Sequence, residues 1–279
     1  MIINGKKIAD DIATACIQRI VTFAHPPQLV ALCCAPTFAT KRFLEIKKAR
    51  AASIGIPLST IELSPLSTTE AVIAAVHDAV GKYDGVLVQL PFPVGIDTEA
   101  VLGAIPYSHD VDAMGYEASA RLELGTTEVL PPVVGAIRAI AERHAIDFRD
   151  AKVVVVGAGR LVGKPAAQWL RGKGAHVTTL TNEVQNLSEQ TRSADVLVLG
   201  AGVPGLIEPD MVADGVSIFD AGTSEEAGKL VGDADPQCAL KASLFTPVPG
   251  GIGPITVSII FQNLLALYAE RQRADKGVS

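Results

Sequence analysis

The stretch AKVVVVGAGRLVGKPAAQWLRGKG, residues 151–174, decides the fold of the C-terminal half of the chain. Its four valines predict a buried strand, and the glycines after them predict a sharp turn into a helix over 161–174. At such a turn the backbone can approach a pyrophosphate, and free amides at the helix N-terminus stabilise its charge. The spacing GxGxxxG is one residue longer than the usual fingerprint, and any tight turn also favours glycine. The stretch predicts a Rossmann-type dinucleotide-binding domain.

Apolar runs alternate with amphipathic segments on both sides of this motif. Helices are expected over 41–53 and 70–83, and the strands are expected at 29–34, 58–63, 85–90, 176–180, 194–200 and 216–222. Such alternation is typical of right-handed crossover units and a parallel sheet. Proline and glycine make residues 104–131 irregular, which indicates a domain junction there.

We therefore expect an α/β protein of two domains. The first is an N-terminal α/β domain over 1–130, completed by a C-terminal helix over 255–279. The second is a Rossmann-type domain with a parallel sheet over 131–254. The first twenty residues mix both charge signs with amphipathic spacing, so they read as the first helix of the fold and not as a secretory signal.

Composition excludes several classes of partner. The 279 residues carry a net charge of −6, which argues against binding to nucleic acid or to an anionic membrane. Mean hydropathy is +0.33, but prolines and glycines break the first half of the longest uncharged stretch at the C-terminus, 244–269. The last helix is expected after Pro254, which leaves about fifteen residues against the ~20 that a membrane span needs.

The four cysteines show no metal-binding or disulfide spacing: Cys16, Cys33, Cys34 and Cys238. No metal is expected. Free thiols fit a reducing compartment, so a cytoplasmic location is predicted.

Thr40, Phe43 and Lys47 have the spacing of one helical face. A lysine on an apolar face loses hydration, which lowers its pKa toward a range useful for proton transfer. The alternative is a lysine of the basic run over 41–50 that extends its ammonium into water.

Two further polar groups follow predicted strands. Gln89 stands at the carboxyl end of the strand 85–90, where parallel sheets collect their ligands. His109-Asp110-Val-Asp112 offers two carboxylates that share a face if the segment is extended and separate if it turns. A carboxylate can bind an amidine-like edge by two hydrogen bonds, although both acids also suit turns and caps.

The segment FTPVPGGIGPIT, residues 245–256, restricts the backbone strongly. Gly250 and Gly251 would let a flat ring come close, and the Thr256 hydroxyl could reach it. For the nucleotide, Glu183 could bind ribose hydroxyls as in NAD sites, whereas Arg160 could meet a 2′-phosphate of NADP. The motifs GxSxG, HExxH and GxxxxGK[ST] are absent from the sequence.

Five motifs together resemble the methylenetetrahydrofolate dehydrogenase/cyclohydrolase family in order and spacing: YDGVLVQLPFP, HDVDAMG, GAGRLVGKP, KLVGDAD and TPVPGGIGPIT. The resemblance implies a homodimer with a folate cleft between two domains and with NADP or NAD as cofactor. It implies oxidation of 5,10-methylenetetrahydrofolate to the methenyl form and hydrolysis of that product to 10-formyltetrahydrofolate. The habit of the family favours NADP.

The resemblance also assigns site residues. Lys47 matches the catalytic lysine, Gln89 matches the amide that contacts it, and Asp112 matches the acid that binds the pterin. The substrate-binding candidates are Thr40, Phe43, Leu87, Pro91, Gly250, Gly251, Pro254 and Thr256. The cofactor-binding candidates are Gly157, Ala158, Gly159, Arg160, Gly163, Asn182, Gly202, Gly222 and Thr223.

Two departures from the family pattern concern the helix face of Lys47. Thr40 and Phe43 stand where the family has serine and tyrosine, so a proton relay through a tyrosine hydroxyl is lost. Three hypotheses follow: a bifunctional enzyme, a dehydrogenase without the hydrolase step, and a non-catalytic folate- or nucleotide-binding regulator.

Overall fold

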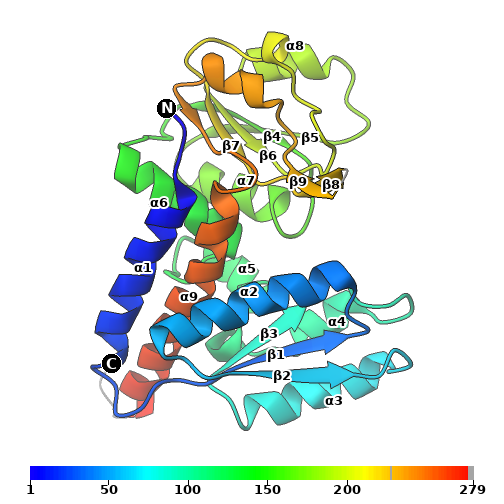
Figure 1. Cartoon of the computed structure of the whole chain (residues 1–279), viewed down its shortest axis with the longest axis vertical. Helices are drawn as coiled ribbons and strands as arrows, with labels where there is room; N and C mark the ends of the chain where they lie inside the picture. The colour runs from blue at the N-terminus through cyan, green and yellow to red at the C-terminus, as the bar shows by residue number, and fades with distance from the viewer. Residues whose placement is uncertain (227, 276–279) are drawn as a thin grey trace. The chain divides into compact units, whose positions relative to one another are not determined.

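A computed structural model describes residues 1–226 and 228–275, in two units that each have a sheet of parallel strands (Figure 1). Of the described residues, the three-stranded unit contains Asp11–Arg121, Thr127–Leu130 and residues 257–275. The five-stranded unit contains Met1–Asp10, Leu122–Thr126 and Pro131–Thr256. The predicted α/β class with parallel sheets is confirmed.

The three-stranded sheet has the order β2-β1-β3, with β1 (Leu29–Cys34) between β2 (Leu58–Leu63) and β3 (Gly85–Gln89). All its pairs are parallel, and β1 is buried at every position. Such burial on both faces explains why the sequence of β1 is a continuous apolar run instead of an alternating one.

The two faces of this sheet pack against different helices. Leu29, Ala31 and Leu87 belong to a core with α1 (Gly5–Ile20), α2 (Phe38–Ile54) and α9 (Ile252–Asp275). The alternate positions of the same strands pack on α3 (Thr69–Val80) and α4 (Thr98–Gly103) (Figure 1). Because side chains alternate along a strand, Gln89 faces the same side as Leu87, which is the side of α2.

Helix α2 has a cap at each end. The Thr37 hydroxyl accepts a hydrogen bond from the amide of Thr40, and Gly55 ends the helix in the left-handed conformation at φ 77°. The N-cap starts the helix three residues before the expected position, and it places Thr40 in the first turn.

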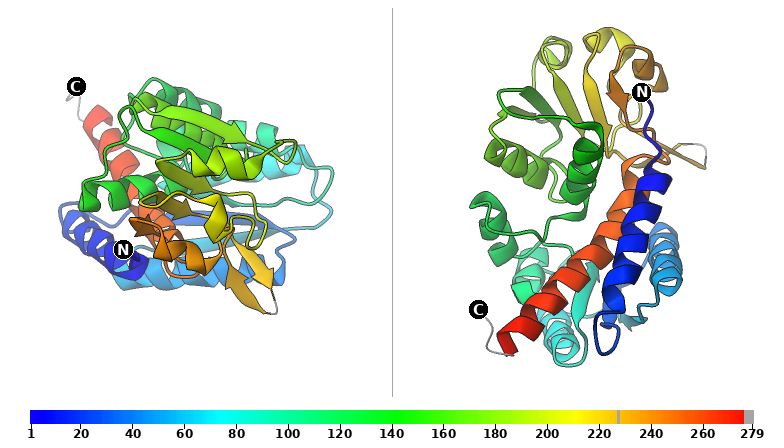
Figure 2. Two further views of the ribbon diagram at one scale, coloured as in Figure 1. Left: turned by 90° about the horizontal axis from the view of Figure 1, so that it is seen from above. Right: turned by 90° about the vertical axis from the view of Figure 1, so that its left-hand side faces the viewer.

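Helix α9 begins three residues before the expected start after Pro254. It has 24 residues and begins at Ile252, because a proline is tolerated in the first turn, where amides have no helical partner. The helix is long and apolar enough to cross a membrane, but 67% of its most apolar window is buried inside the protein. From Asp11 to Ile20, α1 lies beside α9, as both Figure 1 and the right view of Figure 2 show. We therefore describe α9 as a core helix.

The five-stranded sheet has the order β10-β7-β6-β4-β5, all parallel. Its strands are β4 (Lys152–Val156), β5 (His176–Leu180), β6 (Val196–Leu199), β7 (Ser217–Asp220) and β10 (Leu244–Phe245). The chain runs from β4 to β5 on one side and then crosses to β6 on the other. The carboxyl ends of β4 and β6 thus form the switch point at which such sheets bind ligands.

Shorter elements complete both units. The helices are α5 (Tyr116–Glu123), α6 (Pro132–His144), α7 (Gly163–Gly172) and α8 (Leu187–Arg192), and the 3-10 turns are η1 (Tyr107–His109), η2 (Pro209–Met211) and η3 (Pro236–Leu240). An antiparallel hairpin joins β8 (Ser224–Glu226) to β9 (Lys229–Val231). Helix α5 lies in the stretch 104–131, which the sequence suggested to be irregular, and the ion pair of Glu117 with Arg121 one turn apart supports it.

The first ten residues pack in the five-stranded unit, whereas the sequence analysis placed them in an N-terminal domain over 1–130. Ile2 forms a parallel bridge with Phe245, and the amide of Ile3 donates to the Phe245 carbonyl at 2.9 Å. These bonds explain why Met1–Asp10 belongs to the five-stranded unit.

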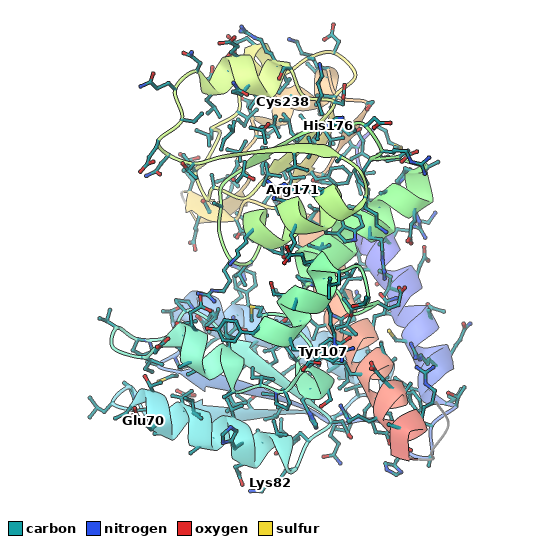
Figure 3. All side chains as sticks on the ribbon, turned by 180° about the vertical axis from the view of Figure 1, so that it is seen from behind. Glu70, Lys82, Tyr107, Arg171, His176 and Cys238 are labelled. Carbon is teal, nitrogen blue, oxygen red and sulfur yellow. The ribbon has the colours of Figure 1, made fainter. Side chains whose placement is uncertain are left out.

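The cysteines are all free and buried, and Figure 3 shows Cys238 among the side chains of the five-stranded unit. Within residues 1–226 and 228–275, no group of three or more His, Cys, Asp or Glu side chains could hold a metal ion.

Candidate active site

A lysine and an amide meet at the carboxyl end of the three-stranded sheet. The Lys47 Nζ atom on α2 donates to the Gln89 Oε1 atom at the end of β3, at 2.9 Å. The Gln89 Nε2 atom donates to the carbonyl of Leu90 at 3.4 Å. Because the side-chain oxygen is the acceptor, the amide holds the ammonium over the end of the sheet.

Asp112 lies in the next segment along this sheet edge. Asp110 forms a parallel bridge with Val86 of β3, and the carbonyl of Val111 accepts a hydrogen bond of 2.9 Å from the buried Asn263 side chain of α9. These two contacts fix the turn that carries Asp112. The three residues with expected catalytic roles therefore come from α2, β3 and the segment beside β3.

The electrostatics of Lys47 and Asp112 are coupled. Burial lowers the pKa of the Lys47 ammonium, and the negative charge of Asp112 counteracts this shift. Burial likewise raises the pKa of Asp112, and the charge of Lys47 counteracts that shift. A lysine whose pKa is lowered loses its proton more readily than a hydrated lysine, which favours general acid–base chemistry.

The two acids of the HDVD segment have separate environments, as expected for a turn. Asp110 is 1% exposed, and its Oδ2 atom accepts a hydrogen bond of 2.7 Å from the amide of Gly115. Burial raises the pKa of Asp110 to about 7, although bonds from backbone amides partly oppose the shift. Asp110 therefore holds the turn, while Asp112 carries the charge that Lys47 experiences.

Four substrate-binding candidates lie near this edge, with very different exposure. Thr40 is 7% exposed, and its hydroxyl is 2.9 Å from that of Thr37. Phe43 is 41% exposed, whereas Leu87 is fully buried in the core with α2. Pro91 is exposed and follows a cis peptide bond. Of the four side chains, those of Phe43 and Pro91 are open to a ligand.

The glycine-rich loop after β10 is held rigidly in the five-stranded unit. The carbonyl of Gly250 accepts from the amide of Gly5 at 2.9 Å, and the amide of Gly251 donates to the Pro247 carbonyl at 2.7 Å. Gly250 has φ 106°, a conformation that side chains disfavour. The next candidate, Pro254, is half-buried in the first turn of α9.

Thr256 follows in the same helix. Its hydroxyl donates to the carbonyl of Gly253 at 2.7 Å, so the hydroxyl oxygen still has lone pairs with which to accept.

The turn after β4 has the close packing of a dinucleotide loop. A Cβ atom on Gly163 would lie 1.8 Å from the carbonyl oxygen of Gly157, so glycine is required where α7 begins. Ala158 and Gly159 are exposed, and Arg160 is partly exposed. The helix begins two residues later than expected because the chain first makes this close approach. Exposed backbone at a helix N-terminus fits the pyrophosphate of a dinucleotide.

The remaining cofactor candidates follow β5, β6 and β7. Asn182, Gly202 and Thr223 are exposed, whereas Gly222 is buried. Gly202 lies in a loop whose amides bond the side chain of Asp233, at 3.1 Å from the Gly202 amide. Asp233 was not among the expected site residues, although the motif KLVGDAD that contains it pointed to the family.

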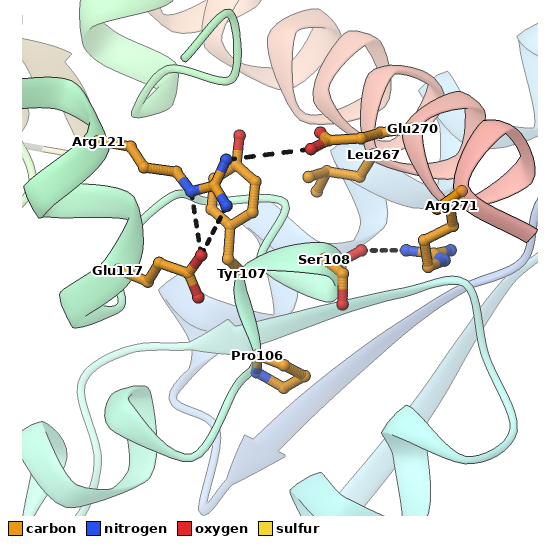
Figure 4. A pocket seen from close by; sticks show the side chains of 9 residues that line it. Pro106, Tyr107, Ser108, Glu117, Arg121, Leu267, Glu270 and Arg271 are labelled. Atoms are coloured by element: carbon orange, nitrogen blue, oxygen red, sulfur yellow. Dashed lines mark hydrogen bonds and ion pairs between the residues drawn. The ribbon is translucent and has the colours of Figure 1, made fainter. Parts of the chain in front are cut away.

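A cavity of about 260 Å³ opens beside α9, and neither Lys47, Gln89 nor Asp112 lines it (Figure 4). The Arg121 guanidinium lies 4.0 Å from the centre of the Tyr107 ring and pairs with Glu117 at 2.8 Å and Glu270 at 3.9 Å. Because these carboxylates balance its charge, the cavity is a poor site for an anionic folate or nucleotide.

Comparison with known proteins agrees with this geometry. The family description "Tetrahydrofolate dehydrogenase/cyclohydrolase, catalytic domain" matches residues 3–112, and "Tetrahydrofolate dehydrogenase/cyclohydrolase, NAD(P)-binding domain" matches residues 131–272. The bifunctional protein FolD of Halothermothrix orenii is 36% identical over 273 residues, which cover 94% of this chain and 95% of that protein.

Two solved structures have the same fold over almost the whole chain. The bifunctional FolD enzyme of Campylobacter jejuni superposes with a TM-score of 0.93 at 28% identity, over 97% of this chain and 99% of its own. The FolD enzyme of Trypanosoma brucei, in complex with NADP cofactor and an inhibitor, gives 0.91 at 26% identity over 98% of both chains. The resemblance seen in the sequence is thus confirmed, and the chain belongs to the tetrahydrofolate dehydrogenase/cyclohydrolase family.

Proposed function

We propose that the protein oxidises 5,10-methylenetetrahydrofolate to 5,10-methenyltetrahydrofolate with NAD(P)+ and hydrolyses the product to 10-formyltetrahydrofolate. The observation that carries this proposal is the Lys47–Gln89 hydrogen bond beside Asp112, in a chain that belongs to the family. The lysine with a lowered pKa supplies the proton-transfer group that the hydrolysis requires, and the amide and the carboxylate supply the pterin-binding groups that both steps require.

The residues of the three-stranded unit have distinct roles in this proposal. The Asp112 carboxylate binds the pterin by two parallel hydrogen bonds, as carboxylates bind amidine-like edges. Gln89 orients the Lys47 amine through their 2.9 Å hydrogen bond. Lys47 takes up the proton of the water that attacks the methenyl carbon and returns it when the ring opens. The exposed Phe43 ring offers a stacking surface for the substrate.

The residues of the five-stranded unit hold the dinucleotide. The exposed backbone of Ala158 and Gly159 takes the pyrophosphate, and the loop at Gly250 and Gly251, whose glycines carry no side chains, leaves room for a ring of the folate. When bound, the dinucleotide accepts hydride from the methylene carbon of the folate. Because hydride transfer depends mainly on the orientation of two rings, rigid loops are suited to it.

NADP is the cofactor that we favour over NAD. The structure of the T. brucei relative contains NADP. In this chain, Arg160 stands in the glycine turn, where its guanidinium could bind the 2′-phosphate of NADP. Glu183 after β5 is the feature that would suit NAD instead. Initial rates with each cofactor at equal concentration decide between them.

A dehydrogenase without the hydrolase step is the second candidate. Phe43 favours it, because a phenyl ring lacks the hydroxyl that the resemblance places there. Accumulation of methenyltetrahydrofolate during turnover, followed by its absorbance, would identify this activity. If purified protein turns over methylenetetrahydrofolate with neither cofactor, a folate- or nucleotide-binding regulator is the remaining explanation.

We further propose that the protein is a cytoplasmic homodimer. The resemblance to the family supports the dimer, and four free cysteines support a reducing compartment. Light scattering coupled to gel filtration measures the oligomeric state, and a monomeric mass would contradict the proposal.

A further inference from the structure

Two buried carboxylates of the five-stranded unit take no part in the proposed reaction. Asp233, which follows β9, is 0% exposed. Its Oδ2 atom accepts from the amides of Ala201 at 2.6 Å and Gly202 at 3.1 Å, and its Oδ1 atom accepts from that of Val203 at 2.9 Å. One side chain therefore binds three consecutive amides of the loop after β6.

A second carboxylate holds Asp233 in place. Asp220, at the end of β7, is 1% exposed. Its Oδ1 atom accepts from the amides of Gly222 at 2.9 Å and Asp233 at 3.2 Å, and its Oδ2 atom accepts from that of Ala234 at 2.9 Å. The ends of β6 and β7 are thus joined through two side chains, not through backbone pairing alone.

Both carboxylates occupy space that a neighbouring glycine leaves free. A Cβ atom on Gly222 would lie 2.3 Å from the Asp233 carboxyl carbon, and one on Gly232 would lie 2.1 Å from the Asp220 Oδ2 atom. Gly222 was expected to bind the cofactor, but it is buried and leaves room for Asp233.

The loop that Asp233 holds lies at the switch point of the sheet. β6 pairs with β4, so Ala201–Val203 follow the strand beside the one that ends in the glycine turn. Because Asp233 occupies the three amides, they are not available to a phosphate. The exposed amides of the glycine turn suit the pyrophosphate, while the loop after β6 suits the neutral, hydroxyl-bearing part of a dinucleotide. A second side chain also orients the loop after β6, because the Ser224 hydroxyl of β8 donates to the Gly202 carbonyl at 2.9 Å.

We propose that Asp233 is a positioning residue for the dinucleotide: its carboxylate sets the backbone of Ala201–Val203 in the conformation that receives the ribose and nicotinamide portion. This inference rests on the proposed function. Asp220 supports it by fixing the segment that carries Asp233. Neither side chain touches the cofactor itself.

The test is the binding of NADP and NAD to the Asp233→Asn variant, measured by titration calorimetry. Asparagine has one acceptor oxygen, so at least one of the three loop amides faces an NH2 group. Loss of one hydrogen bond between a loop amide and the charged Asp233 carboxylate should raise the Kd for the dinucleotide about tenfold or more. In steady state, KM for the dinucleotide should rise similarly, while KM for the folate changes less than about twofold.

Asp235→Asn is the matched control. Asp235 belongs to the same motif, but its carboxylate accepts from the amide of Gln237 at 2.7 Å and caps η3. This variant should bind the dinucleotide like the wild type. Wild-type affinity in Asp233→Asn, or an equal loss in Asp235→Asn, would overturn the inference.

Ser224→Ala is the second variant if Asp233→Asn does not fold, because Ser224 is only half-buried and its hydroxyl holds the same loop from the surface side. Removal of its bond to Gly202 should raise Kd about threefold at an unchanged melting temperature, and an unchanged Kd would overturn the inference. The proposed function fails separately, if the wild-type protein binds neither NADP nor NAD.

Discussion

The Lys47 ammonium and the Gln89 amide meet at 2.9 Å, with a helix supplying the first and a strand end supplying the second. The contact depends on the alternation of side chains along β3, which turns Gln89 toward α2 together with Leu87. It also depends on the N-cap at Thr37, which starts α2 early enough for Lys47 to be in its third turn. A register shift of one residue in β3 would remove the contact.

Asp112→Asn should move the acid limb of the cyclohydrolase pH profile to lower pH. The charge of Asp112 raises the pKa of Lys47, so its removal leaves burial to lower that pKa further. If the neutral amine is the active base, kcat/KM then falls at a more acidic pH than in the wild type. The measurement is the pH dependence of methenyltetrahydrofolate hydrolysis, and a shift to higher pH would contradict the coupling.

Asp110→Asn should change the pH dependence of stability. The pKa of Asp110 is raised from 3.8 to about 7, so between these values the native state holds a proton that the unfolded state has lost. The free energy of unfolding contributed by this group therefore falls as pH rises from about 4 to 7, by up to about 4 kcal/mol. Asparagine does not titrate, so the variant should gain stability relative to the wild type over that range.

Denaturant unfolding at pH 4.5 and pH 7.5 measures this difference. His109 titrates with the opposite sign, because burial and the charge of Arg271 lower its pKa to about 4. It is present in both proteins, so its contribution cancels in the comparison. A constant stability difference between the variant and the wild type would contradict the raised pKa of Asp110.

Gly250→Ala should destabilise the protein, whereas Gly253→Ala should not. Gly250 has φ 106°, which costs a residue with a side chain about 1–3 kcal/mol. Gly253 lies in α9, is exposed, and has no atom within 4 Å of an added Cβ atom. Alanine there should add about 0.5–1 kcal/mol through its higher helix propensity. Thermal melting measures both, and equal melting temperatures would refute the role given to the Gly250 backbone.

Phe43→Tyr should raise the ratio of hydrolase to dehydrogenase activity. Phe43 is 41% exposed, so the added hydroxyl finds room and stability should change by less than about 0.5 kcal/mol. The hydroxyl would restore a proton relay beside Lys47. The check is the two rates in parallel assays, and an unchanged ratio would show that the ring serves only for stacking.

The sequence predicted the strands better than the connections. β1 and β2 occupy the expected residues, because a continuous aliphatic run and its glycine and proline borders are local signals. Helix α5 was missed in a segment rich in proline and glycine. The start of α9 was also missed, since a helix that begins before Pro254 depends on how its first turn packs.

The candidate site shows the same contrast. Motifs in the sequence singled out Lys47, Gln89 and Asp112 as candidates, and in the structure Lys47 interacts with both of the others. The separate roles of Asp110 and Asp112 required the turn geometry, which spacing alone left open. Asp233 was overlooked because its partners are backbone amides some thirty residues away, and backbone amides carry no signature in a sequence.

The most direct test of the account compares methenyltetrahydrofolate hydrolysis by the wild type, Lys47→Gln and Lys48→Gln. Lys48 is the matched control, since it pairs with Glu45 at 2.9 Å and lies one position along α2. Loss of a general acid–base group should lower the hydrolase rate by about 10²–10⁴-fold. We predict that Lys47→Gln hydrolyses the substrate at no more than the spontaneous rate and keeps measurable dehydrogenase activity, while Lys48→Gln behaves like the wild type. Undiminished hydrolysis by Lys47→Gln would contradict the account.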